Sequence, residues 1–303
     1  MQGKECAMSI SNEDFKKLLA EEVSKYEGVY VPLKASLLER AIIRSAKPSD
    51  LHPNPDDEFS FPNIGPNYSI IANYESKFRT TGKVKDNPWD ESIMVQKIHP
   101  SGYMILNGHH RWAGAMRANI KRVPITIINL TQETDVKKML MASKHDKRVT
   151  IDLDEIVFCD PNEVPAEKPM GFPANRVYKE RIRLGIPSLL HILSKNGYDI
   201  WVYTAKLYSY DYISNYFKKY SVKLDGIITG TGRKTKEHEA TRQRLKELME
   251  NKYEETLHIE NDFVVRSFRD KKDYQDIEIK EDENGWSYAV INIIKGLYPD
   301  EKK

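Results

Sequence analysis

The stretch RVTIDLDEIVFCD, residues 148–160, decides the fold of the second half of the chain. It has the β-branched and apolar residues of a buried strand, and two carboxylates, Asp152 and Asp154, stand at its end. Residues two apart on a strand face the same way, so both carboxylates can converge on one ion or substrate. Carboxylates this close repel each other, and a hard divalent cation such as Mg²⁺ relieves that repulsion. The pair therefore predicts metal and phosphate chemistry.

From residue 149 onward, apolar strands alternate with helical segments joined by short loops, which predicts a doubly wound parallel sheet. Ligands of such sheets bind beyond the carboxyl ends of the strands. Three further groups fall at positions of that kind. They are the Thr204 hydroxyl at the end of a second strand, Lys234 or Lys236 in GRKTK, and Asp262 with Asn261 in TLHIENDF. Together with the aspartate pair they form a phosphoryl-transfer set.

The second half resembles the haloacid dehalogenase (HAD) superfamily. DLDEIV is similar to its first motif, WVYTA to its second, Lys234 to its third and END to its fourth. The resemblance implies a Rossmann-like domain in which Asp152 is the nucleophile that forms an aspartyl-phosphate and Asp154 is the general acid and base. It also implies that Thr204 and Lys234 position the transferred group and that Mg²⁺ is held by Asp152, the backbone carbonyl of Asp154, and Asp262.

In the first half, two apolar runs broken at residues 100–102 predict paired strands, and a helix follows in YMILNGHHRWAGAMRAN. Gly108 separates strand from helix. The first helical amides and the side chains of His109, His110 and Arg111 then face one small volume, which is typical of a phosphate site. The alternative is metal binding by the two histidines, although adjacent helical residues point about 100° apart.

These residues resemble the ParB/sulfiredoxin fold, over about residues 42 to 130. KPSDLHPNPDD is similar to the opening box of the ParB N-terminal domain, and GYMILNGHHRWAGAMRANIKRVPITII to its second box with the following helix and strand. Members of this fold bind nucleotides, so the resemblance implies nucleotide phosphate contact by Gly108, His109, His110 and Arg111. ATP, ADP and CTP are the expected nucleotides.

Neighbouring residues distinguish the members of this fold. His109 replaces the catalytic cysteine of sulfiredoxin, and Asn107 stands where free serine kinases have aspartate. Asp57 or Glu58, in the loop before this segment, is a candidate base or metal ligand.

The composition describes a globular protein. Of 303 residues, 40% are hydrophobic and 30% are charged, and 47 basic residues against 45 acidic ones give a net charge of +2. No apolar run has the length of a membrane span, and no secretory signal opens the sequence. The two cysteines, Cys6 and Cys159, lack metal-ligand spacing and fit a reducing compartment, so we expect a cytoplasmic protein.

We therefore expect an α/β protein with two domains. A ParB/sulfiredoxin-like α+β domain covers residues 1–130 with a helical extension over residues 1–41, a helical linker covers residues 131–147, and a HAD-like domain covers residues 148–303. The expected function is Mg²⁺-dependent phosphatase or phosphotransferase activity on a phosphomonoester. The phosphorylated partner can be a small molecule, a phosphopeptide or a nucleic-acid end.

Two alternatives stay open. One is a ParB/sulfiredoxin-fold kinase or nucleotide hydrolase with a regulatory HAD half. The other is a nucleic-acid-binding or end-processing protein. The sequence leaves the oligomeric state undetermined.

Overall fold

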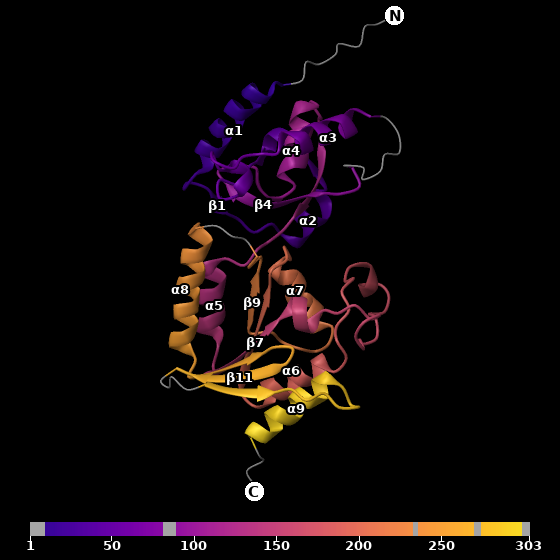
Figure 1. Cartoon of the computed structure of the whole chain (residues 1–303), viewed down its shortest axis with the longest axis vertical. Coiled ribbons are helices and arrows are strands. Elements are labelled where there is room, and N and C mark those ends of the chain that lie inside the picture. Colours follow the sequence, from indigo (N-terminus) through magenta and orange to yellow (C-terminus); the bar gives the residue numbers. More distant parts are fainter. Residues whose placement is uncertain (1–9, 81–88, 233–235, 270–273, 299–303) are drawn as a thin grey trace, which may run out of the picture. The chain divides into compact units, whose positions relative to one another are not determined.

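The computed structural model describes residues 10–80, 89–232, 236–269 and 274–298, with the backbone alone for residues 236–242. The chain divides into two compact units, one formed mainly by Met1–Asn129 and the other by Leu130–Arg233 and His238–Lys303 (Figure 1). No helix within the described ranges is long and apolar enough to cross a membrane.

The first unit combines helices with a mixed sheet. Its helices are α1 (Asn12–Tyr26), α2 (Leu37–Ile42), α3 (Tyr68–Arg79) and α4 (His109–Arg117). Its strands are β1 (Val31–Pro32), β2 (Ser45–Ala46), β3 (Leu51–His52), β4 (Ile93–His99), β5 (Tyr103–Asn107) and β6 (Val123–Ile127).

The sheet of this unit has the order β2-β6-β4-β5-β3, and β1 pairs with β4 beside this path. The expected strand pair is β4 and β5, which run antiparallel, whereas β4 with β6 and β3 with β5 are parallel. Helix α1 belongs to this unit, because Phe15 and Leu19 are buried in the same apolar cluster as Trp112 of α4. The helical extension is thus packed on the domain that follows it.

The second unit contains the remaining elements. Its helices are α5 (Glu133–Ala142), α6 (Ile186–Lys195), α7 (Tyr210–Lys218), α8 (Lys236–Lys252) and α9 (Trp286–Leu297). Its strands are β7 (Lys147–Asp152), β8 (Tyr198–Thr204), β9 (Gly226–Thr229), β10 (Glu255–Ile259), β11 (Phe263–Phe268) and β12 (Tyr274–Glu278).

The sheet of the second unit is mixed rather than wholly parallel. Its order is β12-β11-β10-β7-β8-β9, with parallel pairing from β10 to β9 and antiparallel pairing of β11 with β10 and with β12. The expected parallel sheet is therefore corrected at this edge. The reason is the tight turn after β10, which returns the chain as a hairpin instead of through a crossover helix. The Rossmann-like HAD assignment stays a prediction.

Helices cover both faces of this sheet. On one face, Val149 and Ile151 of β7 share an apolar cluster with residues of α6, α7 and α9. On the other, Trp201 of β8 packs with Val136 of α5 and Tyr253 after α8. Residues 131–147 therefore do not form a separate linker, because α5 buries its apolar side in the second unit.

Candidate functional site

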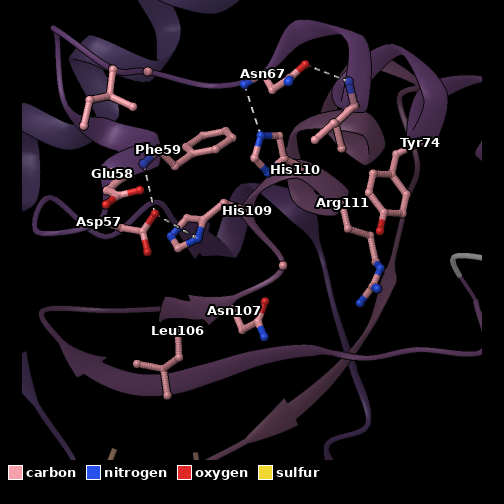
Figure 2. Close-up of a pocket in the computed structure, with 14 residues that line it drawn as sticks. Asp57, Glu58, Phe59, Asn67, Tyr74, Leu106, Asn107, His109, His110 and Arg111 are labelled. Atoms are coloured by element: carbon pink, nitrogen blue, oxygen red, sulfur yellow. Dashed lines mark hydrogen bonds and ion pairs between the residues drawn. The ribbon is translucent and has the colours of Figure 1, made fainter. Parts of the chain in front are cut away.

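A pocket of about 410 Å³ lies in the first unit where β5 passes into α4 (Figure 2). A cavity of this size suits a small ligand. Residues from the loop before α3, from α3 and from the β5–α4 junction line it: Asp57, Glu58, Phe59, Ile64, Gly65, Asn67, Ile70, Tyr74, Leu106, Asn107, Gly108, His109, His110 and Arg111. The four residues predicted to contact phosphate are all among them.

Gly108 makes the junction between strand and helix. Its φ of +102° lies in the region that other residues rarely adopt, so the chain can turn sharply from β5 into α4. Gly108 is the N-cap residue of α4 and has no side chain to cap the first turn. Amide groups at the start of a helix carry partial positive charge, and the start of α4 lies at the wall of the pocket.

The two histidines point in different directions (Figure 2). His109 Nε2 accepts a hydrogen bond from Asn54 N at 3.3 Å, and its Nδ1 lies 3.7 Å from Asp57 Oδ1. His110 Nε2 accepts from Asn67 N at 3.1 Å. Each histidine therefore holds, by a hydrogen bond, one part of the loop that forms the opposite wall of the pocket. The alternative of joint metal ligation by the pair does not match this arrangement.

Phe59 completes the packing around both imidazoles. Its ring stacks on His109 with centroids 5.3 Å apart and meets His110 edge-on at 5.0 Å. Burial lowers the pKa of His110, and the nearby Asp57 carboxylate opposes that shift only in part. A neutral imidazole is what the accepted hydrogen bond from Asn67 requires.

Arg111 is 7% exposed and lies beside Tyr74, whose ring centroid is 5.5 Å from the guanidinium carbon. Its Nη1 donates to the Ser92 carbonyl at 3.1 Å, and its Nη2 forms an ion pair with Glu91. The Glu91 side chain is 69% exposed. A buried guanidinium at the pocket wall thus has a solvent-facing carboxylate as its counterion.

Asp57 and Glu58 bring acidic groups to the same pocket. Asp57 Oδ1 accepts from Phe59 N at 3.0 Å, which holds this carboxylate in place at the start of a short 3₁₀ turn. The sequence indicated both residues but not Phe59, Asn67 or Tyr74. Asn67 was detectable as the N-cap of α3, since its side chain accepts from Ser69 N and Ile70 N.

In the second unit, Asp152 lies at the end of β7, where the backbone enters a π-helical turn (Leu153–Val157). Asp152 Oδ1 accepts from Asp154 N at 2.7 Å and from Glu155 N at 2.9 Å. These bonds orient the carboxylate at the strand end.

Asp154 and Thr204 are in direct contact. Asp154 Oδ2 accepts from Thr204 Oγ1 at 2.8 Å and from Ala205 N at 2.8 Å. Asp154 Oδ1 is buried and accepts no hydrogen bond from any residue that the structure describes, while Lys206 Nζ lies 3.4 Å away from it. Parallel pairing of β7 with β8 brings Asp152 and Tyr203 into register, which explains why the two strand ends meet.

Of the other charged residues predicted for this set, only Asp262 is fully described. Lys234 and the side chain of Lys236 lie outside the described residues. Asp262 is exposed in the turn between β10 and β11, with its carbonyl bound to Ile279 N at 2.8 Å. In the described part of the chain, no three carboxylate, imidazole or thiol groups lie close enough together to hold a metal ion. The predicted three-aspartate metal set is therefore not assembled.

Residues 83–144 match the model of the ParB N-terminal domain. Among solved structures, the chain is similar to the C-terminally truncated chromosome-partitioning protein ParB from Caulobacter crescentus complexed with CTP-γ-S. The identity is 23% and the TM-score 0.23, and the match covers 34% of this chain and 55% of that one. The chain thus spans about half the length of that ParB structure. No curated protein matches this sequence. In residues 83–144, the chain is thus similar to the ParB N-terminal domain.

Proposed function

We propose that the first unit binds a nucleoside triphosphate, with its phosphates at the start of α4. The observation that carries this proposal is the convergence of Gly108, His110 and Arg111 on one pocket of about 410 Å³. The helix start and the guanidinium are suited to anionic oxygens. Tyr74 offers aromatic surface to the rest of the ligand.

Titration of the full chain with ATP, ADP, CTP, GTP and UTP in a calorimeter tests this function. The informative variant is Arg111→Lys, which keeps the charge but loses the planar fork, and we expect it to weaken binding about tenfold. Arg44→Lys, at an exposed arginine of the same unit, is the matched control. Absence of binding by the wild type, or equal affinity in Arg111→Lys, would contradict the proposal.

A second function is supported by the contact between Asp154 and Thr204 beside Asp152. We propose that this site transfers a phosphoryl group. The Asp152 carboxylate attacks phosphorus while Asp154 gives its proton to the departing oxygen. Water then attacks the aspartyl-phosphate, loses a proton to Asp154 and releases the Asp152 carboxylate and inorganic phosphate.

A divalent cation fits the oxygen donors of this site. The Asp152 carboxylate and the backbone carbonyl of Asp154 would hold Mg²⁺, which would neutralise charge on the phosphate and leave the Asp154 carboxyl for proton transfer. Asp154 Oδ1 is buried without a hydrogen-bond donor among the described residues and lies 3.4 Å from Lys206 Nζ, which would balance its charge while it is ionised. The Thr204 hydroxyl and the Ala205 amide would orient Asp154 toward the leaving group.

Hydrolysis of an aryl phosphate with and without Mg²⁺ tests the second function. We expect Asp152→Asn to remove the activity and Asp276→Asn, at an exposed position of β12, to preserve it. If nucleotide is instead turned over in the first unit, Arg111→Lys will lower that turnover and Asp152→Asn will not. The two functions therefore give separate outcomes.

A further inference from the structure

A long loop follows the turn that contains Asp154. We call residues 158–184 the flap: they connect the π-helical turn to α6. The base of the flap is closed by antiparallel bridges between Phe158 and Ile182 and between Ala166 and Arg183. Arg183 N also donates at 2.8 Å to the carbonyl of Val157, the last residue of the turn that holds Asp154. The flap therefore begins and ends at the candidate phosphotransfer site.

Helix α7 holds one side of the flap. Tyr212 OH donates to the Glu180 carboxylate and, at 3.3 Å, to Val177 O. Tyr216 OH donates to Glu180 O at 3.2 Å. Figure 1 shows the excursion before α6 extending away from the sheet on the side of α7. The hydrogen bonds from Tyr212 and Tyr216 therefore hold this side of the flap against α7.

The outer part of the flap presents an aromatic ring to solvent. Phe172 is 73% exposed, and the Arg176 guanidinium carbon lies 4.9 Å from its ring centroid. Arg176 is itself exposed. A flat ring paired with a flat cation on an exposed loop is a surface on which a nucleobase can stack.

The flap carries a small excess of positive charge. Residues 158–184 contain five basic and four acidic residues. Two of the acids are engaged within the unit, since Glu167 Oε1 accepts from Gly185 N at 2.8 Å and Glu180 binds Tyr212. Lys168 and Lys179 are exposed together with Arg176. Cations around an exposed ring complement a polyanion that carries bases.

Tyr208, four residues after the strand end at Thr204, packs at the base of the flap. The ring of Tyr208 lies 6.0 Å from that of Phe158 at the flap base, and 5.7 Å from that of Tyr212 in a parallel stack. Burial raises the pKa of Tyr208, and the Glu180 and Asp154 carboxylates raise it further. Tyr208 therefore joins the base of the flap to α7.

We propose that the flap binds single-stranded nucleic acid, stacking a base on Phe172 and contacting phosphates through Arg176 and the neighbouring lysines. The delivery of a terminal phosphate to Asp152 rests on the phosphotransfer function proposed above. A phosphopeptide is less suited to this surface, because it has no bases to occupy the exposed ring and guanidinium.

The test is fluorescence anisotropy with a labelled single-stranded oligonucleotide of about twelve nucleotides that ends in a phosphate. The full chain is compared with the double variant Phe172→Ala/Arg176→Gln. The matched control is Tyr274→Ala/Lys195→Gln, which changes an aromatic residue that is 69% exposed and an exposed lysine away from the flap. Hydrolysis of an aryl phosphate is measured on the same samples.

We expect the flap variant to bind about tenfold more weakly and the control to bind like the wild type. The slope of log affinity against log salt should become less negative by about 0.7 for the lost phosphate contact. Unchanged binding in the flap variant, an equal loss in the control, or equally strong competition by a phosphopeptide would overturn the proposal. If binding follows the flap while no aryl phosphate is hydrolysed, the flap proposal stands and the phosphotransfer function fails.

Discussion

The backbone N–H of Asn67 donates to His110 Nε2 at 3.1 Å, so the start of α3 is tied to the first turn of α4 across the pocket. His109 makes the corresponding bond to Asn54 N. The residues that suggested a phosphate site from sequence are thus also the residues that hold its far wall. Loss of either hydrogen bond should weaken ligand binding and make the loop at the far wall less ordered.

Replacing His110 by Phe tests the hydrogen bond between Asn67 N and His110. The variant keeps an aromatic ring but loses the acceptor, at a cost of about 1 kcal/mol for one hydrogen bond. We expect faster hydrogen exchange at the Asn67 amide and weaker nucleotide binding. His110→Gln, whose amide oxygen can accept, is the control and should show a smaller effect. Unchanged exchange at Asn67 in His110→Phe would rule out the tie.

The ion pair between Glu91 and Arg111 predicts that one substitution will increase nucleotide affinity. The exposed Glu91 carboxylate occupies a guanidinium arm that a phosphate would otherwise use. Glu91→Gln should therefore increase nucleotide affinity, by about threefold to tenfold, in the same calorimetric titration. Asp90→Asn removes a neighbouring exposed charge and should change the affinity less. A weaker affinity in Glu91→Gln would show that Glu91 supports Arg111 and does not compete with the ligand.

His258 of β10 makes stability depend on pH. Burial, followed by the charges of Arg148 and Lys246, lowers its pKa from an ordinary value near 6.5 to about 4. Between these values the unfolded chain binds a proton that the folded chain does not, so the free energy of unfolding falls as pH decreases from 6.5 to 4. The loss reaches about 3 kcal/mol for this group.

Urea unfolding at several pH values measures this effect. His258→Gln, which retains a polar partner for Thr150, should flatten the pH dependence over that interval relative to the wild type. Parallel curves for the two proteins would contradict a lowered pKa at His258.

Gly114 of α4 allows α3 and α4 to pack closely beside the pocket. A Cβ at this position would lie 2.6 Å from Tyr74 Cβ and 2.9 Å from Glu75 N. Gly114→Ala should therefore destabilise the first unit by about 1–3 kcal/mol, more than the gain of up to about 1 kcal/mol in helix propensity. Gly171→Ala, in open space, is the control. Equal unfolding midpoints for both variants would refute this packing argument.

Local sequence patterns were enough to predict the elements that carry both candidate sites. Gly108 between an apolar strand and a helix, and Asp152 and Asp154 after a β-branched run, are patterns within a few residues, so backbone periodicity and glycine conformation are enough to predict them. The meeting of Asp154 with Thr204 also followed from parallel strand order, because neighbouring parallel strands end at the same edge of a sheet.

The contacts between distant parts of the chain could not be predicted in this way. The pairing of Glu91 with Arg111, the bonds from His109 and His110 to the opposite loop, and the packing of Val136 against Trp201 join residues far apart in the chain. The antiparallel return of β11 and β12 likewise depends on pairing with β10. Such contacts are set by the register and docking of whole elements, which local periodicity does not encode.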